Sequence, residues 1–361
     1  MFRRKINLMN SIKTWQKLKE NPELFKRYFI KEYIIKAIRK FFEEKKYHEL
    51  ESPILAPALP QEHYSNPLSV DLGTGNKEIK KVYLIPSTER YNKLILAAGL
   101  GNHFVISKVF RNLEEIGPNH SPEFTMCEWY HLDTDYYGLM NDSEELFIYI
   151  QRFLCKELFK KDFSNTLSFR EYIIDLTPKW DRLSVVDALK NYCSINLEDI
   201  QNLKEFRKIA QSKGYNINDN DDWEIIFELI FANEIEPHLN LNRPTFVYDY
   251  PKQLCPLTKL SLKNLLVAEK FELYIAGKEI ANGYTELIDW EEQEKRFKDE
   301  EFQRNKIGKE PIKFDKELID ALRLGLPEVS GIGIGIDRIA MIFANAISIA
   351  DINYFPASEY Y

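Results

Sequence analysis

The 361-residue sequence predicts an α+β fold, with helices flanking a mostly antiparallel sheet. Three observations support this class. Apolar residues recur at helical spacing over residues 25–42, short apolar and aromatic runs separated by loops read as strands, and a glycine-rich apolar run near the C-terminus leads into a helical pattern. We therefore expect residues 21–361 to form one compact domain and residues 1–20 to be an N-terminal extension.

The first helix is predicted to start at Asn21, because Pro22 suits the first helical position, and to end near Lys45 and Lys46. Residues 47–57 read as an extended strand that is stopped by prolines. Residues 57–82 hold many Pro, Gly and Asn and are predicted to form a long surface loop.

Further strands are predicted at residues 81–85, 103–111 and 123–132, with a short apolar helix at residues 90–100. The chain then reads as mostly helical from 141 to about 240, with interruptions at 164–185 and 214–222. Next come strands at 244–250 and 270–287, a charged helix at 290–308, and a glycine-rich strand running into a helix at 329–346.

Composition excludes several classes of protein. The net charge of −7 argues against a general nucleic-acid binder, and 44% hydrophobic residues are ample for a folded core. The four cysteines are far apart without a C-x-x-C motif, and the six histidines form no ligand-spaced cluster, which argues against structural zinc and disulfides. No apolar run approaches the roughly 18 residues of a membrane span, so we expect a cytoplasmic protein.

The run "GIGIGIDRIAMIF" contains three glycines, Gly331, Gly333 and Gly335, which alternate as one face of a strand does. A dinucleotide fingerprint needs a different spacing, G-x-G-x-x-G, so that interpretation fails. Missing side chains on one strand face leave a flat platform for a planar ring. Arg338 directly afterwards favours a nucleotide, although tight packing of strand on helix remains an alternative.

Three acids, Glu272, Glu279 and Glu286, are spaced by seven residues. On one strand an odd spacing would place Glu272 and Glu279 on opposite faces, but the turn at residues 276–278 allows them to face the same side. Two carboxylates without softer ligands suit Mg²⁺ bridging phosphates. The alternative is a hairpin with solvated acids.

The segment "FRNLEEIGPNHSPEFTMCEWY" is predicted to be a hairpin whose long polar loop separates Arg111 from Phe124. Together with "YHELESPIL" and "GIGIGIDRIAMIF", it resembles motifs 2, 1 and 3 of the class II aminoacyl-tRNA synthetases, in that order along the chain. Within that class, "PSTERYNKL" and "GKEIANGYTELIDWEEQEKRF" are similar to the lysyl type. The resemblance implies the class II catalytic fold for residues 21–361.

The resemblance also implies site roles, with ATP and Mg²⁺ as cofactors. Arg111 and Arg338 would be catalytic, and the acids Glu272 and Glu279 would hold the metal. The nucleotide would contact Arg111, Asn112, Glu114, His120, Phe124, Glu279, Ile280, Asn282, Gly335 and Arg338. The lysine-type amino acid would contact Ser87, Thr88, Glu89, Tyr130, Glu286 and Gly333.

A lysyl-tRNA synthetase carries an N-terminal anticodon-binding domain, whereas about 20 residues precede the first predicted catalytic helix here. The chain is most similar to the truncated relatives that attach a lysine-type amino acid to elongation factor P. We therefore expect elongation factor P rather than tRNA as the acceptor, and a homodimer that buries the region around Pro53. Acylation of an RNA or a small molecule, and a non-catalytic regulatory role, remain alternatives.

Two positions depart from the family pattern. Leu113 separates Arg111-Asn112 from the acids, so either Glu114 or Glu115 would reach the adenine amino group. Gly333 lies where the elongation-factor ligases tend to carry a small side chain and the tRNA synthetases a glycine. The roomier pocket would favour α-lysine over (R)-β-lysine.

Overall fold

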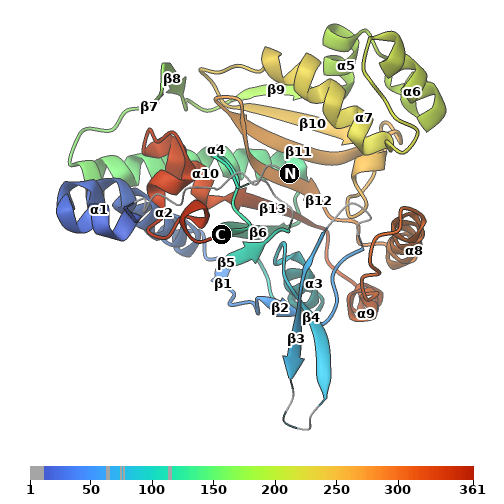
Figure 1. Ribbon diagram of the computed structural model, residues 1–361, viewed down its shortest axis with the longest axis horizontal. Coiled ribbons are helices and arrows are strands. Elements are labelled where there is room, and N and C mark those ends of the chain that lie inside the picture. Colours follow the sequence, from blue (N-terminus) through green and yellow to red (C-terminus); the bar gives the residue numbers. More distant parts are fainter. Residues whose placement is uncertain (1–11, 62–65, 74, 76–77, 113–115) are drawn as a thin grey trace, which may run out of the picture.

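A computed structural model describes residues 12–61, 66–73, 75, 78–112 and 116–361. Its centre is an eight-stranded sheet with the order β1-β5-β6-β13-β12-β11-β10-β9 (Figure 1). These strands are β1 (His48–Glu49), β5 (His103–Phe110), β6 (Glu123–Leu132), β9 (Asp181–Ser184), β10 (Thr245–Pro251), β11 (Val267–Ile275), β12 (Lys278–Thr285) and β13 (Val329–Gly335). Only β1–β5 and β9–β10 pair in parallel within this sheet, which confirms the predicted mostly antiparallel α+β class.

One face of the sheet is covered by α2 (Phe25–Glu44), α4 (Tyr136–Phe153) and α10 (Ile336–Phe343), which share the largest apolar core with it. Side chains along β6 point alternately to the two faces of the sheet, which shows which face the helices cover. Cys127 and Trp129 belong to this core and are fully buried, whereas Met126, Glu128 and Tyr130 face the other way. The second face therefore carries polar side chains at its centre.

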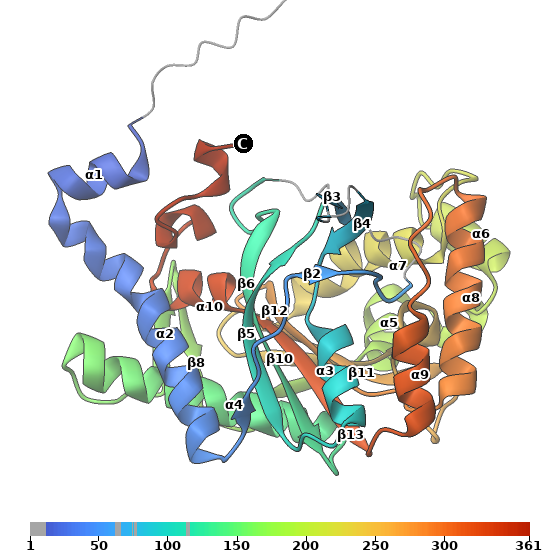
Figure 2. The same ribbon diagram turned by 90° about the horizontal axis from the view of Figure 1, so that it is seen from below.

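Two further groups of helices surround the sheet (Figures 1 and 2). Helices α5 (Val185–Cys193), α6 (Leu203–Ser212) and α7 (Trp223–Ile230) form a second apolar core with β10 and β11. Helices α3 (Glu89–Ala97), α8 (Trp290–Lys306) and α9 (Lys316–Leu324) form a third. The first turn of α3 thereby lies against the polar face of the sheet.

Smaller elements lie at the periphery. Strands β2 (Leu55–Ala56), β3 (Leu68–Gly73) and β4 (Ile79–Leu84) form a three-stranded sheet whose β3–β4 hairpin projects from the body (Figure 1), and β7 (Thr166–Phe169) pairs with β8 (Tyr172–Asp175). Helix α1 (Thr14–Glu20) is attached to the C-terminal segment, because the Thr14 N–H and hydroxyl both donate to the Glu359 carboxylate.

Most predicted elements are present at their expected places. The predicted helix start at Pro22 is a 3₁₀ turn, Pro22–Leu24, that continues into α2. The predicted strand at 47–57 is reduced to the two-residue strands β1 and β2. The prediction of a long loop at 57–82 is wrong over β3 and the start of β4. β3 does alternate apolar Leu68, Val70 and Leu72 with other residues, but the Pro, Gly and Asn of the surrounding segment favoured a loop, and none of the residues of β3 is buried.

Candidate functional site

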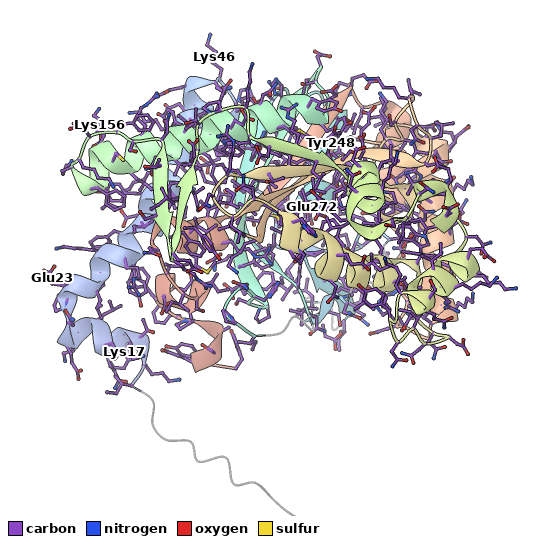
Figure 3. The ribbon with its side chains drawn as sticks, turned by 90° about the horizontal axis from the view of Figure 1, so that it is seen from above. Lys17, Glu23, Lys46, Lys156, Tyr248 and Glu272 are labelled. Carbon is purple, nitrogen blue, oxygen red and sulfur yellow. The ribbon has the colours of Figure 1, made fainter. Side chains whose placement is uncertain are left out.

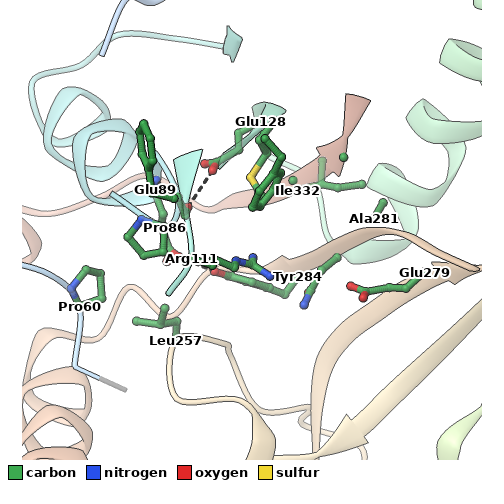
Figure 4. A pocket seen from close by; sticks show the side chains of 18 of the residues that line it. Pro60, Pro86, Glu89, Arg111, Glu128, Leu257, Glu279, Ala281, Tyr284 and Ile332 are labelled. Atoms are coloured by element: carbon green, nitrogen blue, oxygen red, sulfur yellow. Dashed lines mark hydrogen bonds between the residues drawn. The ribbon is translucent and has the colours of Figure 1, made fainter. Parts of the chain in front are cut away.

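A cavity of about 470 Å³ lies on the polar face of the sheet. Strands β6, β12 and β13 form its floor, and the start of α3, the loop after β5 and residues 254–258 form its walls. In the close view, Glu89 and Glu128 lie toward one end, Glu279 lies at the other, and Arg111 lies between them (Figure 4). Of the predicted site residues, the cavity is lined by Ser87, Glu89, Arg111, Asn112, His120, Phe124, Tyr130, Glu279, Ile280, Asn282, Gly333, Gly335 and Arg338.

Three predicted site residues that the structure describes do not line the cavity. Thr88, Glu272 and Glu286 lie behind its wall. Glu114, like Glu115, lies outside the described residues, so the choice between these two acids as adenine contact remains a prediction.

The three alternating glycines of β13 lie in the floor, and they are not equivalent. A Cβ atom at Gly331 would lie 2.5 Å from Glu286 Oε1 and 2.6 Å from Tyr130 Cε1, distances too short for any real contact. At Gly333 the nearest atom would be Met126 Sδ at 3.2 Å, and at Gly335 it would be a backbone oxygen at 4.0 Å. Gly331 is therefore required by the side chains packed over it, whereas Gly335 leaves an open platform.

Arg111 follows directly after β5, and Phe124 lies opposite in β6 beyond the polar loop. The guanidinium carbon of Arg111 lies 5.4 Å from the centre of the Phe124 ring, within the range of a cation–π contact. Since both side chains border the cavity, they present a cation and an aromatic face to the same space.

Arg338 lies in the first turn of α10, immediately after the glycine strand. Its Nη1 donates to the Glu279 carbonyl at 2.6 Å, and its Nε donates to the Asn119 carbonyl at 3.2 Å. The Glu279 carboxylate is 3.3 Å from the same Nη1. Arg338 therefore connects the loop after β5 to the β11–β12 hairpin across the cavity.

The β11–β12 hairpin explains how acids seven residues apart share a face. Its two-residue turn has positive φ at both Ala276 (49°) and Gly277 (70°), as a type I′ hairpin requires, and it pairs Tyr274 with Glu279. Glu279 therefore faces the same side as Glu272, as the turn was expected to allow.

A bulge follows in β12, because Tyr274 pairs with Glu279 whereas Leu273 pairs with Ala281. The extra residue lets Asn282 face the cavity as well, although it lies an odd three positions after Glu279. Asn282 Oδ1 is buried and accepts no hydrogen bond from the described residues, so it can receive one from a ligand.

The Glu272 side chain, labelled near the middle of the view in Figure 3, is 15% exposed and is surrounded by donors. One of its oxygens accepts hydrogen bonds from the Tyr250 and Tyr274 hydroxyls at 2.8 and 2.9 Å, and the other lies 3.1 Å from Lys270 Nζ. Burial, followed by the nearby Glu272 charge, raises the pKa of Glu279. A cation placed beside Glu279 would relieve this repulsion.

At the other end of the cavity, Glu128 holds the start of α3. One carboxylate oxygen accepts from the Ser87 hydroxyl at 2.7 Å and the Thr88 N–H at 2.8 Å, and the other accepts from Asn92 at 3.1 Å. Burial raises the pKa of Glu128, although these hydrogen bonds act in the opposite direction. The Ser87-Thr88-Glu89 segment is thus positioned by a carboxylate from β6.

Behind Glu128 lies a group of buried charges. Lys93 Nζ is 2.6 Å from Glu89 Oε1 and 2.7 Å from Glu286 Oε2, and the Tyr284 hydroxyl donates to the other Glu89 oxygen at 2.8 Å. The Lys93 and Glu286 side chains are 1% and 0% exposed. Apart from the ion pair with Lys93, neither oxygen of Glu286 accepts a hydrogen bond from the described residues.

Two tyrosines complete this end. Burial raises the pKa values of Tyr130 and Tyr284 well above the ordinary value, and the neighbouring carboxylates add to the shift. Both therefore remain protonated and act as hydrogen-bond donors.

Three further residues of the site, Glu128, Lys93 and Tyr284, were not predicted from the sequence. For Glu128 a signal existed, because Phe124, Met126, Glu128 and Tyr130 alternate along β6, and a carboxylate in an otherwise apolar strand face is unusual. Lys93 had no such signal, since a lysine on a nine-residue helix normally faces solvent.

Within the described residues, no group of three or more His, Cys, Asp or Glu side chains forms a ready metal site. A search of the same residues finds no helix with the length and hydropathy of a membrane span.

The sequence also matches a known protein family. Residues 10–359 match the family described as class II tRNA synthetases (D, K and N). The match includes nearly all of the described chain and every residue of the cavity.

Curated relatives fall into two groups. The chain is 34% identical over 345 residues to a lysine–tRNA ligase of Thermoanaerobacter pseudethanolicus, and 34% identical over 337 residues to one of Legionella pneumophila. These alignments cover 94% and 93% of this chain but 65% of each ligase, so the chain spans just under two thirds of their length. It is 33% identical over 353 residues to an elongation factor P–(R)-β-lysine ligase of Salmonella paratyphi B, with 97% of this chain and 100% of that protein covered.

Proposed function

Because this chain belongs to the class II tRNA synthetase family (D, K and N), we propose that it is an ATP-dependent amino acid ligase. It activates lysine or (R)-β-lysine as an aminoacyl-adenylate and transfers it to a lysine side chain of elongation factor P. The observation that carries this proposal is the division of one cavity into an end bordered by Arg111 and Arg338 and an end lined by the buried acids Glu89 and Glu128, with a third buried acid, Glu286, behind the wall.

In the first step, a carboxylate oxygen of the amino acid attacks the α-phosphorus of ATP, and the bond to the pyrophosphate oxygen breaks. Arg111 lies between the two ends and would contact both the α-phosphate and the attacking carboxylate. Phe124 and Arg338 would hold the adenine ring, and His120 the outer phosphates. Because the substrate itself is the nucleophile, the protein's contribution is positioning and charge stabilisation.

Mg²⁺ would neutralise the phosphates during this step, and the donor set fits such an ion. Glu279 offers a hard oxygen ligand at the cavity, and burial together with the neighbouring Glu272 charge raises its pKa. Glu272 lies on the same face, with both oxygens engaged by Lys270 and two tyrosines. We propose Glu279 as a direct ligand and Glu272 as its companion behind the cavity wall.

The charges at the acidic end match a diamino acid. Lys93 pairs with Glu89 and Glu286, whereas Glu128 accepts only from neutral donors, so these three acids carry two more negative charges than the ammonium compensates when all are ionised. Lysine and β-lysine each bring two ammonium groups, which would restore neutrality. An amino acid with an uncharged side chain would leave a buried carboxylate unpaired.

Gly333 bears on the choice between the two isomers. A Cβ atom there would meet Met126 and Glu128, so the glycine leaves space between the floor and these side chains. The proposal that this space favours α-lysine is tested by comparing the two isomers in the exchange assay below.

In the second step, the amine of the acceptor attacks the carbonyl carbon of the adenylate, an amide bond forms, and AMP leaves. Elongation factor P is favoured as acceptor by the relatives that are matched over their full length. Charging of an RNA is the second candidate, because lysine–tRNA ligases are equally similar over the shared part. A purely regulatory role is disfavoured, since Arg111, Arg338 and Glu279 are all at the cavity.

We also propose a homodimer formed through the region around Pro53, as class II cores commonly pair there. Light scattering at micromolar concentration would test this, and a monomeric mass would contradict it.

The activation step is tested by lysine-dependent exchange of pyrophosphate into ATP. Arg111→Ala should reduce the exchange rate by about 100-fold or more, because a lost charge-assisted donor to the transition state costs roughly 3–4 kcal/mol. Arg323→Ala, on the exposed face of α9, is the matched control and should exchange at the wild-type rate. Near wild-type exchange by Arg111→Ala would contradict the assigned site.

The acceptor is tested by incubation of the protein with ATP, Mg²⁺ and labelled α- or β-lysine, with elongation factor P and tRNA both present. Label on elongation factor P supports the proposal. Label on tRNA alone would replace it by the second candidate, and exchange without any labelled acceptor would indicate a small-molecule amine.

A further inference from the structure

Lys93 is a buried cation that the activation chemistry does not use. Its ammonium lies between Glu89, four residues earlier on α3, and Glu286, at the end of β12. It does not border the cavity, and its side chain is 1% exposed. Since burying an ammonium is costly, an apolar residue would be the cheaper choice if the position served packing alone.

The contacts of Lys93 are ion pairs rather than directed hydrogen bonds. Both N···O distances are short, but neither the ammonium nor the Glu286 oxygens make a well-aligned hydrogen bond within the described residues. The ammonium therefore compensates two carboxylates at once and leaves each with capacity to accept a further donor.

The groups that surround Glu286 come from four elements. Helix α3 contributes Lys93 and Glu89, β6 contributes Glu128 and Tyr130, and β12 contributes Tyr284. The fourth element, β13, contributes Gly331, which has no side chain to offer. Among the described residues, Lys93 is the cation that pairs with Glu89 and Glu286, since Arg90, the other buried cation of α3, pairs with Asp315 and Glu317.

We propose that Lys93 is a positioning and specificity-determining residue: it is the resident counter-ion of Glu89 and Glu286, and with Glu128 it leaves three buried carboxyl groups against one ammonium, a deficit of two cations that a diamino acid would supply. This inference rests on the proposed function for the identity of the substrate. The ion-pair geometry of Lys93, from which the inference is argued, does not depend on the proposed function.

The consequence for the carboxylates follows from electrostatics. Burial already raises the pKa of Glu286, while Lys93 acts to lower it and Glu89 to raise it. Without the Lys93 ammonium, Glu286 would take up a proton at a still higher pH, because two other acids face it. A substrate ammonium would then have to displace that proton.

The test uses Lys93→Met, in the exchange assay from pH 6 to pH 9.5. The KM for lysine at pH 7 should rise at least about tenfold, as for truncation of one partner of a buried charge pair, with the KM for ATP unchanged. The inflection of kcat/KM for lysine should move upward by about one pH unit or more. Lys316→Met, in an exposed i,i+4 pair with Asp320, is the matched control and should change neither quantity.

A double variant separates the counter-ion role from packing. In Lys93→Met/Glu286→Gln the titrating carboxyl group is removed together with its counter-ion, so the shifted inflection of Lys93→Met should be absent. If the Glu286→Gln change instead leaves the shifted inflection in place, or if Lys93→Met raises the KM without moving the inflection, the proposal is overturned. Lys93→Arg, which keeps the charge, should retain the wild-type profile.

Thermal unfolding provides a readout that needs no substrate. A carboxyl group whose pKa is raised in the folded state favours folding at low pH and loses that contribution as the pH rises toward the folded value. The destabilisation of Lys93→Met relative to wild type should therefore grow as the pH rises above about 8, the value to which the pKa of Glu286 is raised in the wild type. A constant difference would refute the counter-ion role even if the protein activates a different amino acid, and a wild type that exchanges no lysine would refute only the proposed function.

Discussion

Replacing Gly331 by alanine should damage amino-acid binding and leave ATP binding intact. The new Cβ would lie 2.5 Å from Glu286 Oε1 and 2.6 Å from Tyr130 Cε1. Since ordinary contacts begin near 3.4 Å, the two side chains would have to move by about 0.9 and 0.8 Å. The Tyr130 and Glu286 side chains are both buried, and Glu286 is held by Lys93, so neither can relieve the clash by moving into solvent.

Overpacking of this kind costs about 1–3 kcal/mol, which corresponds to a roughly 5- to 160-fold rise in the KM for lysine. The assay is lysine-dependent pyrophosphate exchange, with the KM for ATP measured in parallel. The ATP value should stay within about twofold, because the clash lies at the acidic end and not beside Arg111 or Arg338.

Gly333→Ala is the matched control, since it adds the same methyl group to the same face of the same strand. Its nearest neighbour would be Met126 Sδ at 3.2 Å, the adaptable part of a flexible side chain, so the cost should remain below about 1.5 kcal/mol. Equal effects of the two substitutions on lysine, or a larger effect of Gly331→Ala on ATP, would refute the reasoning.

Two further predictions concern the metal and the stability of the fold. Glu279→Gln should raise the Mg²⁺ concentration needed for half-maximal exchange by about tenfold or more, and an unchanged Mg²⁺ requirement would remove Glu279 as ligand. Burial alone would raise the pKa of Asp337, but Lys31, the Thr125 N–H and Asn353 together lower it. This lowered pKa stabilises the fold above the ordinary pKa of aspartate, and the contribution is lost as the pH falls through the folded value. Asp337→Asn should therefore cost about 3 kcal/mol at neutral pH and progressively less in acid, as measured by thermal unfolding; a difference independent of pH would contradict this.

Much of the cavity could be predicted because its residues follow the period of strands. The alternation of Gly331, Gly333 and Gly335 gave the platform, and the two-residue turn at Ala276-Gly277 gave the common face of Glu272 and Glu279. Such patterns are local, so a single sequence contains them.

The remaining features depend on contacts between distant segments. The burial of Lys93 could not be predicted, because its i,i+4 pair with Glu89 on α3 is a pattern typical of an exposed helix face, and its second partner, Glu286, lies almost 200 residues later. Glu272 lies on the same face as Glu279, as predicted from the sequence. However, three donors from β10 and β11 hold it behind the cavity wall. The bulge that brings Asn282 to the cavity depends on how β11 and β12 are paired, and the residue types in these strands did not indicate this register.

The position of Arg338 has a consequence for the entropy of nucleotide binding. Its guanidinium edge is already engaged by the Glu279 and Asn119 carbonyls, from two loops on opposite sides of the cavity. Hydrogen bonds in the plane of the group leave its flat faces for stacking, so an arriving base finds this side chain in one rotamer. Immobilising a flexible side chain on binding typically costs about 0.5–1.5 kcal/mol. Because the fold already immobilises Arg338, nucleotide binding does not lose this side-chain entropy. The saving does not depend on which purine ring stacks on the guanidinium.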